Sequence, residues 1–273
     1  MKKTRDLASI ISRIGITFGL SIMLALSLYN YYLTAKIVYS QPISDASNNH
    51  FDQSITAHFD FITTLEEIEE RQITFTDIHG REWSVPIDVD LKTYNDCRSN
   101  GYVKVRDNTV VNFDNKKYME DTRDNDEIYA IASYIKETAK GMGYNDFETV
   151  YVFIRMVQSI EYMDDEEYCN GSANEFPKLP IVTLYDGSGD CEDTTYALTA
   201  LLRAAGYDAV IVNYPGHAMC AIAGEFNSGS YFTLSGSDTQ YYYIETTEYG
   251  WNIGELPEQF YSQEPSVFKY VTK

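Results

Sequence analysis

Apolar and polar positions alternate in the first part of the folded chain. Residues 83–90 carry an apolar side chain at every second position, and a run of strand-forming residues at 72–76 precedes them across a turn at His79 and Gly80. Such alternation is the period of a β-strand that buries one face. The pattern predicts a β-hairpin that lies beside the main core.

The pattern then changes to helical spacing. Apolar residues recur three and four positions apart in residues 128–140 and 147–160, which predicts two helices that each bury one face. Asn145 or Asp146 can cap the second helix. A third helix is predicted over residues 191–206. Three strand-like runs follow it, at residues 209–214, 217–223 and 241–246.

An uncharged apolar stretch stands near the N-terminus. Residues 14–28 contain no charge, and tyrosines extend the stretch to residue 32, which approaches the ~20 residues that cross a bilayer. Four basic residues precede the stretch and Lys36 follows it, so the N-terminus is expected in the cytoplasm and the remaining chain outside. A cleaved secretory signal, with a cleavage site at residues 25–27, is the alternative, and it exports the same part of the chain.

These patterns divide the chain into four predicted parts. Residues 40–53 are rich in Ser, Asp and Asn, a composition typical of a tether. The parts are 1–36 as cytoplasmic N-terminus and transmembrane helix, 37–54 as tether, 55–124 as a β-rich extension, and 125–273 as the main domain.

The formal charge of −20 is distributed unevenly. After residue 36 the chain holds 16 basic and 40 acidic residues, a net charge of −24. Nucleic acid is excluded as a partner, because binding to phosphates needs the opposite sign. Acidity of this degree is typical of a soluble exterior domain. It leaves the oligomeric state open.

All four cysteines follow the predicted membrane segment, where an oxidising environment permits disulfides. Cys97 and Cys169 stand in polar, loop-like contexts and form the expected disulfide pair. Cys220 lies in an apolar strand-like run and is expected in the core. Asn170-Gly-Ser172 is a glycosylation acceptor, which fits an outward-facing loop.

The strongest chemical signal is a cysteine at the start of a helix. Cys191 follows a loop of small residues and precedes an apolar helical run, so unpaired N–H groups and the helix dipole favour its thiolate. The carboxylates of Asp190, Glu192 and Asp193 oppose this unless they serve as helix caps, and Asp190 suits the N-cap. His217 and then Glu245 follow in strand-like runs, which supplies a base and an orienting acid.

Four local sequences together resemble the transglutaminase-like cysteine enzyme superfamily, in its membrane-attached archaeal and bacterial branch. They are Gly-Asp-Cys-Glu-Asp-Thr with its Leu-Leu-x-Ala-x-Gly-Tyr helix end, Pro-Gly-His, Tyr-Tyr-Tyr-Ile-Glu-Thr-Thr, and Gly-Trp-x-Ile-Gly-Glu-Leu-Pro. The resemblance covers residues 125–260. It implies an α+β, papain-like core in which the nucleophile helix packs on an antiparallel sheet that presents the histidine and the acid.

The resemblance also implies a mechanism. His217 takes the proton of Cys191, and the thiolate attacks a carboxamide or peptide carbonyl to form a thioester. Glu245 orients the imidazole, although many family members have Asp at this place. The Cys191 N–H and one further donor hold the oxyanion, and Gln158 is the expected second donor. Hydrolysis of a protein or peptide substrate outside the membrane is favoured over cross-linking, and no cofactor is implied.

Two alternatives remain open at this point. A catalytically silent module of the same fold could act in extracellular protein binding or envelope assembly. Metal binding is the other chemistry that Cys and His support, but neither Cys-x-x-Cys nor His-x-x-x-His spacing occurs, so no metal ligand is predicted. The acidic run 164–167 suits calcium in principle and is interpreted as a solvated loop.

Overall fold

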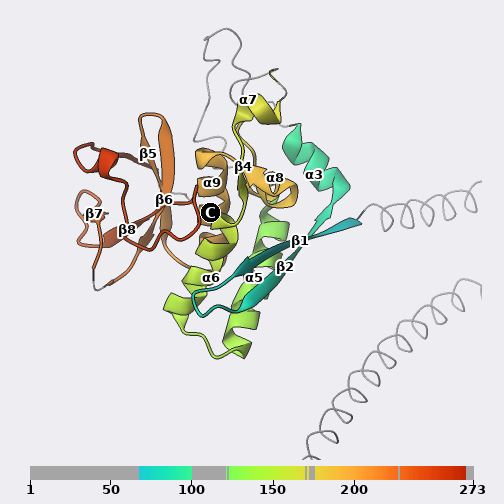
Figure 1. Cartoon of the computed structure of the whole chain (residues 1–273), viewed down its shortest axis with the longest axis horizontal. Coiled ribbons are helices and arrows are strands. Elements are labelled where there is room, and N and C mark those ends of the chain that lie inside the picture. The colour runs from blue at the N-terminus through green and yellow to red at the C-terminus, as the bar shows by residue number, and fades with distance from the viewer. Residues whose placement is uncertain are drawn as a thin grey trace, which may run out of the picture. The chain divides into compact units, whose positions relative to one another are not determined.

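Helix α9 (Cys191–Ala204) occupies the centre of the fold. The computed structural model of the chain describes residues 68–99, 121, 123–169, 171, 176–226 and 228–268. In Figure 1 the large antiparallel sheet lies on one side of α9, and helix α8 (Pro180–Asp186) lies on the other. Helices that pack on an antiparallel sheet define an α+β protein. The predicted fold class is therefore confirmed at this level.

The two helices predicted before residue 160 form close to their expected ends. Helix α5 (Asn125–Gly141) and helix α6 (Asp146–Gln158) both pack on α9. Asn145 caps α6 with its side chain, which accepts the N–H of Glu148, while the Glu148 carboxylate accepts the N–H of Asn145. This reciprocal capping box satisfies two N–H groups that a first helical turn leaves unpaired.

The strands after α9 form one antiparallel sheet with the order β7-β8-β6-β5-β9. Its neighbours in sequence, β5 and β6, pair as a hairpin in which Ile211 lies opposite Cys220. The strands are β5 (Ala209–Tyr214), β6 (His217–Ala223), β7 (Tyr231–Thr233), β8 (Gln240–Ile244) and β9 (Ser266–Phe268).

Both faces of this sheet are covered. Ile211 and Cys220 belong to the large core around α9, whereas Val212 and Met219 belong to a second apolar cluster, which alternation places on the opposite face. Because neither face meets solvent, the central strands are apolar at consecutive positions. Cys220 is completely buried, as its run of apolar neighbours predicts.

The predicted hairpin is also confirmed. Strands β1 (Ile68–Thr76) and β2 (Glu82–Asp90) pair antiparallel. Phe75 lies opposite Trp83, and their rings stack with centroids 6.0 Å apart. The alternate apolar residues of β2 are buried and join the core that surrounds α9.

Helix α3 (Leu91–Arg98) follows β2 directly and was not anticipated within the predicted β-rich extension. Asp90 ends the strand and caps the helix, because its side chain accepts the N–H of Thr93 at 3.2 Å. Cys97 lies on the buried side of α3, and burial raises the pKa of its thiol to about 12. No disulfide joins cysteines at the described positions, so the expected Cys97–Cys169 pair is wrong. The polar neighbours that suggested a loop form the exposed face of this helix.

Several short elements surround the start of α9. Strand β3 (Glu161–Tyr162) pairs in parallel with β4 (Ser188–Gly189), which leads into α9. The remaining elements are helix α7 (Asp165–Tyr168) and the 3₁₀ helix η1 (Glu258–Phe260).

The predictions for the N-terminal part lie outside the described residues. This applies to the membrane segment at 14–32, to the tether at 37–54, and to Asn170 of the predicted glycosylation site. Within the part of the chain that the structure describes, every helix is too short or too polar to span a bilayer. The transmembrane segment therefore stays a prediction.

Candidate active site

The loop before α9 determines where Cys191 lies. Gly187 ends α8 in the left-handed conformation with a φ of 68°, which glycine adopts without steric cost. Gly189 packs so closely on Asp193 that a Cβ atom there would lie 2.7 Å from the Asp193 Cβ. Asp190 caps the helix by accepting the Asp193 N–H at 3.3 Å. Cys191 is consequently the first residue of α9, as predicted from the loop composition.

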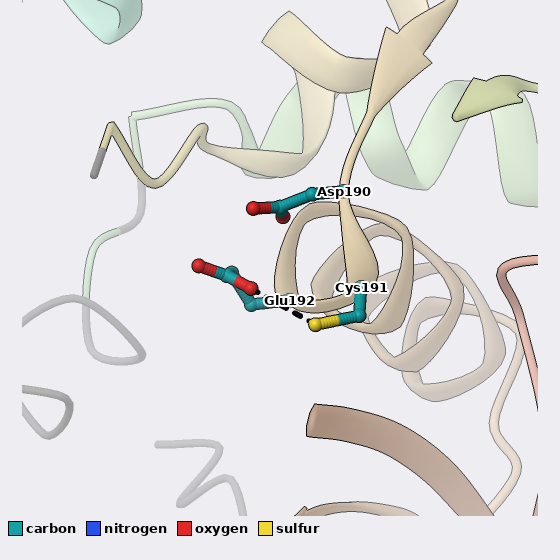
Figure 2. A group of neighbouring side chains, drawn as sticks. All are labelled: Asp190, Cys191 and Glu192. Atoms are coloured by element: carbon teal, nitrogen blue, oxygen red, sulfur yellow. Dashed lines mark hydrogen bonds between the residues drawn. The ribbon is translucent and has the colours of Figure 1, made fainter. Parts of the chain in front are cut away.

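The thiol of Cys191 donates a hydrogen bond to the carboxylate of Glu192, with Sγ and Oε2 3.1 Å apart (Figure 2). Burial raises the pKa of this thiol well above its usual range, and the negative charges of Glu192 and Asp190 raise it further. The N–H of Ala218 acts in the opposite direction. A helix N-terminus favours a thiolate, but burial and two carboxylates outweigh it here. The pKa of the Cys191 thiol is therefore raised, contrary to the low pKa expected from its position in the helix.

The same three residues have the donor types of a metal site. Asp190, Cys191 and Glu192 each offer one possible ligand atom, and these atoms all lie within 4.8 Å of one another (Figure 2). Two carboxylates and a thiolate suit a borderline metal such as zinc. The capping bond of Asp190 and the thiol bond of Glu192 account for the positions of both acids without a metal. The structure therefore assigns no metal to this group.

The acidic run at 164–167 is exposed, as predicted, except at Asp165. Asp165 begins α7, is 3% exposed, and accepts the N–H of Phe176. Burial raises the pKa of Asp165 to about 6, and the negative charge of Glu192 also raises it. The carboxylates around Cys191 are therefore close enough to raise one another's pKa values.

His217 begins β6 and is joined to Glu245. The Nε2 atom of His217 and the Oε2 atom of Glu245 are 2.8 Å apart. The imidazole stacks on Phe260, with ring centroids 5.1 Å apart and ring planes at 7°. The next residue of β6 is Ala218, whose N–H faces the Cys191 sulfur. His217 is thus held between Glu245 and an aromatic ring, on a strand that packs against α9.

Glu245 lies directly after β8 rather than within a strand as predicted. Its Oε1 atom accepts the N–H groups of Thr246 at 2.9 Å and Thr247 at 3.0 Å, and also the Thr247 hydroxyl at 2.8 Å. Burial acts to raise the pKa of Glu245, but the hydrogen bonds from His217 and Thr247 lower it more. Glu245 is therefore a buried carboxylate that stays ionised.

Gln158, the expected oxyanion donor, ends helix α6 and is 4% exposed. Its Nε2 atom donates to the carbonyl of Glu245 at 2.8 Å and to the carbonyl of Trp251 at 3.1 Å. These bonds use both hydrogens of the amide. The oxyanion role stays a prediction, and the contacts instead connect Gln158 to the loop that carries the acid.

Two residues near the site were not identified from the sequence. Phe260 is buried and covers the imidazole of His217, but it lies 43 positions later in the short 3₁₀ helix η1, which has no periodic signal. Tyr162 is half exposed. Burial raises the pKa of Tyr162, and the neighbouring Cys191 and Asp164 raise it further. The β3–β4 pairing brings Tyr162 beside Gly189 and hence close to Cys191, a relation that sequence spacing does not reveal.

Comparison with known proteins gives limited similarity. No protein-family model matches the chain, and no curated protein matches it. The chain is similar to a solved structure described as "Crystal structure of a TGase", with 14% sequence identity and a TM-score of 0.30. The similarity covers 81% of this chain and 53% of that one, so this chain spans about half the length of the protein it matches.

Proposed function

We propose that the protein is a thiol enzyme of transglutaminase-like fold that cleaves or transfers amide bonds through Cys191, His217 and Glu245. The observation that carries this proposal is the 2.8 Å hydrogen bond between His217 and Glu245, on the strand whose Ala218 N–H faces the Cys191 sulfur. Nucleophilic acyl transfer by a thiol needs an acid that orients an imidazole and an imidazole that can take the thiol proton.

The chemistry follows from which atoms are already engaged. Glu245 holds Nε2 of His217, so Nδ1 is the nitrogen that can take the thiol proton. The sulfur then attacks an amide carbonyl carbon. The Cys191 N–H, which belongs to the first helical turn and has no intrahelical acceptor, can donate to the oxyanion. The imidazolium returns its proton to the leaving amine as the C–N bond breaks, which leaves a thioester.

Water or a second amine resolves the thioester, and hydrolysis is the favoured outcome because water is abundant outside a cell. The enzyme acts on a protein or peptide substrate on the outer side of a membrane. Its N-terminal apolar segment, residues 14–32, tethers it there with the N-terminus in the cytoplasm. The net charge of −24 after residue 36 fits this exterior location.

The second candidate is a silent binding module of the same fold. The hydrogen bond from Cys191 to Glu192 and the raised pKa of the thiol favour it, since a thiol held protonated by a carboxylate is a poor nucleophile. The two functions differ in one property: whether His217 lowers the pH at which Cys191 reacts.

This property can be measured by the alkylation of Cys191 with iodoacetamide between pH 5.5 and 9, followed on the Cys191 peptide by mass spectrometry. Full-length wild-type protein is compared with His217→Ala and with His79→Ala, a histidine far from the site. The enzyme proposal predicts labelling below pH 7 that His217→Ala loses and His79→Ala keeps. Labelling only above about pH 8.5, the range of an ordinary thiol, in all three proteins would support the binding module.

A further inference from the structure

The loop from Glu245 to Trp251 is closed by a single side chain. Gln158 bridges the carbonyl of Glu245, at 2.8 Å, and the carbonyl of Trp251, at 3.1 Å. Its Oε1 atom accepts the N–H of Gly250 at 3.3 Å. Gln158 comes from the end of α6, whereas the loop follows β8, so the bonds join two separate elements. The Gln158 amide thus binds both ends of the loop from Glu245 to Trp251, which we call the acid loop.

Arg155 fixes the orientation of that amide. It lies one helical turn before Gln158 and is 7% exposed. Its Nη1 atom donates to Gln158 Oε1 at 2.5 Å and to the Trp251 carbonyl at 2.8 Å, and its Nη2 atom donates to Asn252 Oδ1 at 3.0 Å. A guanidinium can only donate, so it determines that the carbonyl oxygen of Gln158 points toward it and that the NH₂ group points toward the loop.

Two aromatic rings also hold the Arg155 guanidinium in place. Its Cζ atom lies 5.4 Å from the ring centroid of Tyr151 and 5.5 Å from that of Tyr249. Contacts of this kind stabilise a buried arginine whose hydrogen-bond acceptors are all neutral. Arg155 and Gln158 therefore form one ordered polar network against the back of the acid loop.

The bonds to the Glu245 carboxylate do not by themselves place it against His217. Three of them come from Thr246 and Thr247, which belong to the same loop and move with it. They orient the carboxylate relative to the loop. Its position relative to the imidazole depends on what anchors the loop to the rest of the protein, and Gln158 supplies two such anchoring bonds at the acid and at Trp251.

We infer that Gln158, oriented by Arg155, is a positioning residue that sets the distance between Glu245 and His217. This inference rests on the proposed function, because it concerns the reactivity of the Cys191 and His217 pair. It replaces the expected contact of Gln158 with an oxyanion by a contact with the acid loop. The residue acts through Glu245 and touches no reacting atom.

Gln158→Glu tests the NH₂ group of the amide separately from its carbonyl oxygen. The variant keeps the size of the side chain and the oxygen that accepts from Arg155, with which it can form an ion pair. It loses the NH₂ group, so a carboxylate oxygen faces the carbonyls of Glu245 and Trp251 and repels them. Gln158→Asn is the second variant, because its amide is too short to reach both carbonyls. Val157→Ala is the control, since Val157 is a completely buried neighbour on α6 outside the network.

The experiment measures the alkylation rate of Cys191 against pH in full-length protein, with thermal unfolding of each variant alongside. Both Gln158 variants are expected to lose about 10-fold or more of the rate at pH 6.5, a change equivalent to ~1.4 kcal/mol. Val157→Ala is expected to unfold earlier and to keep the wild-type pH profile. Folded Gln158 variants with the wild-type profile would overturn the inference, as would an equal loss in Val157→Ala.

The outcome is separable from that of the proposed function. If wild-type protein and His217→Ala give the same profile, the proposed function fails and the positioning role fails with it. If His217→Ala loses the low-pH reactivity while both Gln158 variants retain it, the proposed function stands and only the positioning role is wrong.

Discussion

The hydroxyl groups of Thr194 and Thr246 are 2.9 Å apart and buried. Thr194 lies in α9, three residues after Cys191, and Thr246 follows Glu245 in the acid loop. The Thr194 hydroxyl also donates to the Asp190 carbonyl at 2.8 Å. This pair therefore links the start of α9 to the loop that carries Glu245.

Thr246→Val tests this link. Valine has nearly the same shape, so the change removes the hydroxyl contact with little loss of packing. We expect a loss of about 1–2 kcal/mol in the free energy of unfolding, because the Thr194 hydroxyl loses a buried partner. We also expect slower alkylation of Cys191 at neutral pH, since the acid loop loses an anchor. Urea unfolding and the labelling assay measure the two effects.

Thr183→Val is the matched control for that substitution. Thr183 is completely buried in α8, and its hydroxyl has no hydrogen-bond partner among the described residues. Replacing an unsatisfied buried hydroxyl with a methyl group is neutral or stabilising. Equal losses of unfolding free energy in Thr246→Val and Thr183→Val would mean that the Thr194–Thr246 hydrogen bond makes no specific contribution to stability.

Features with a local cause could be predicted from the sequence. The capping box of Asn145 and Glu148, the alternation in β2, and the small residues before Cys191 each act over a few positions. Such signals determine an element without reference to distant parts of the chain. The helix start, the hairpin and the strands β5, β6 and β8 therefore agree with the sequence.

Features that depend on distant partners could not be predicted. The contacts of Gln158 join residues 87 and 93 positions apart, and Phe260 contacts His217 from the short 3₁₀ helix η1. The bond of Cys191 to Glu192 depends on a rotamer, which spacing does not encode. Cys97 was misplaced because a short polar helix such as α3 has a weak periodic signal, and its burial comes from packing.

Glu192→Gln should make Cys191 more reactive. The Glu192 carboxylate accepts the thiol hydrogen bond, and its charge contributes to the raised thiol pKa after burial. Glutamine keeps the size and removes the charge, so the thiol pKa should fall by about one unit. We expect alkylation at pH 7.5 to be faster by about 10-fold. Alkylation at pH 7.5, quenched at set times and followed by mass spectrometry of the Cys191 peptide, measures the rate.

Glu137→Gln is the control for a general charge effect, because Glu137 is an exposed acid on α5. It should leave the rate unchanged. A Glu192→Gln protein that labels more slowly than wild type would show instead that the carboxylate helps to remove the thiol proton.

Asp124 should make the protein more stable at pH 5 than at pH 7. It is 2% exposed and accepts the N–H of Ile181 at 3.0 Å. Burial raises its pKa to about 6, whereas an unfolded aspartate titrates near 3.9. Between these values the folded state binds more protons than the unfolded state, so stability falls as pH rises through this range. The contribution lost between pH 5 and pH 7 is about 1 kcal/mol.

Asp124→Asn removes this titration and keeps an oxygen that can accept from Ile181. Thermal or urea unfolding at pH 5 and pH 7 should show a smaller difference between the two pH values in the variant than in wild type. Some difference should persist, because burial also raises the pKa of Asp165 to about 6. If the variant shows the same stability difference between pH 5 and pH 7 as wild type, Asp124 does not cause that difference.

Lys178 should be essential for the folded state, because it is the cation paired with the most buried acid beside the nucleophile. Its Nζ atom lies 3.2 Å from Asp193 Oδ2, with both side chains fully buried, and it donates to the Ser188 carbonyl at 3.1 Å. Lys178→Met fills similar space but leaves Asp193 buried without its cation, for which we expect a loss of about 3–5 kcal/mol at pH 7. Unfolding in urea measures it.

The double variant Lys178→Met with Asp193→Asn determines whether charge is the cause. Asparagine retains an oxygen for the Lys178 main-chain N–H, which Asp193 Oδ1 accepts at 2.7 Å in the native protein, and it carries no charge to compensate. If burial of an unpaired carboxylate causes the loss, the double variant should recover much of the stability that the single variant loses. If both variants are equally destabilised, the lysine acts through packing, including its ammonium 3.8 Å from the ring centroid of Tyr168, and the ion pair contributes little.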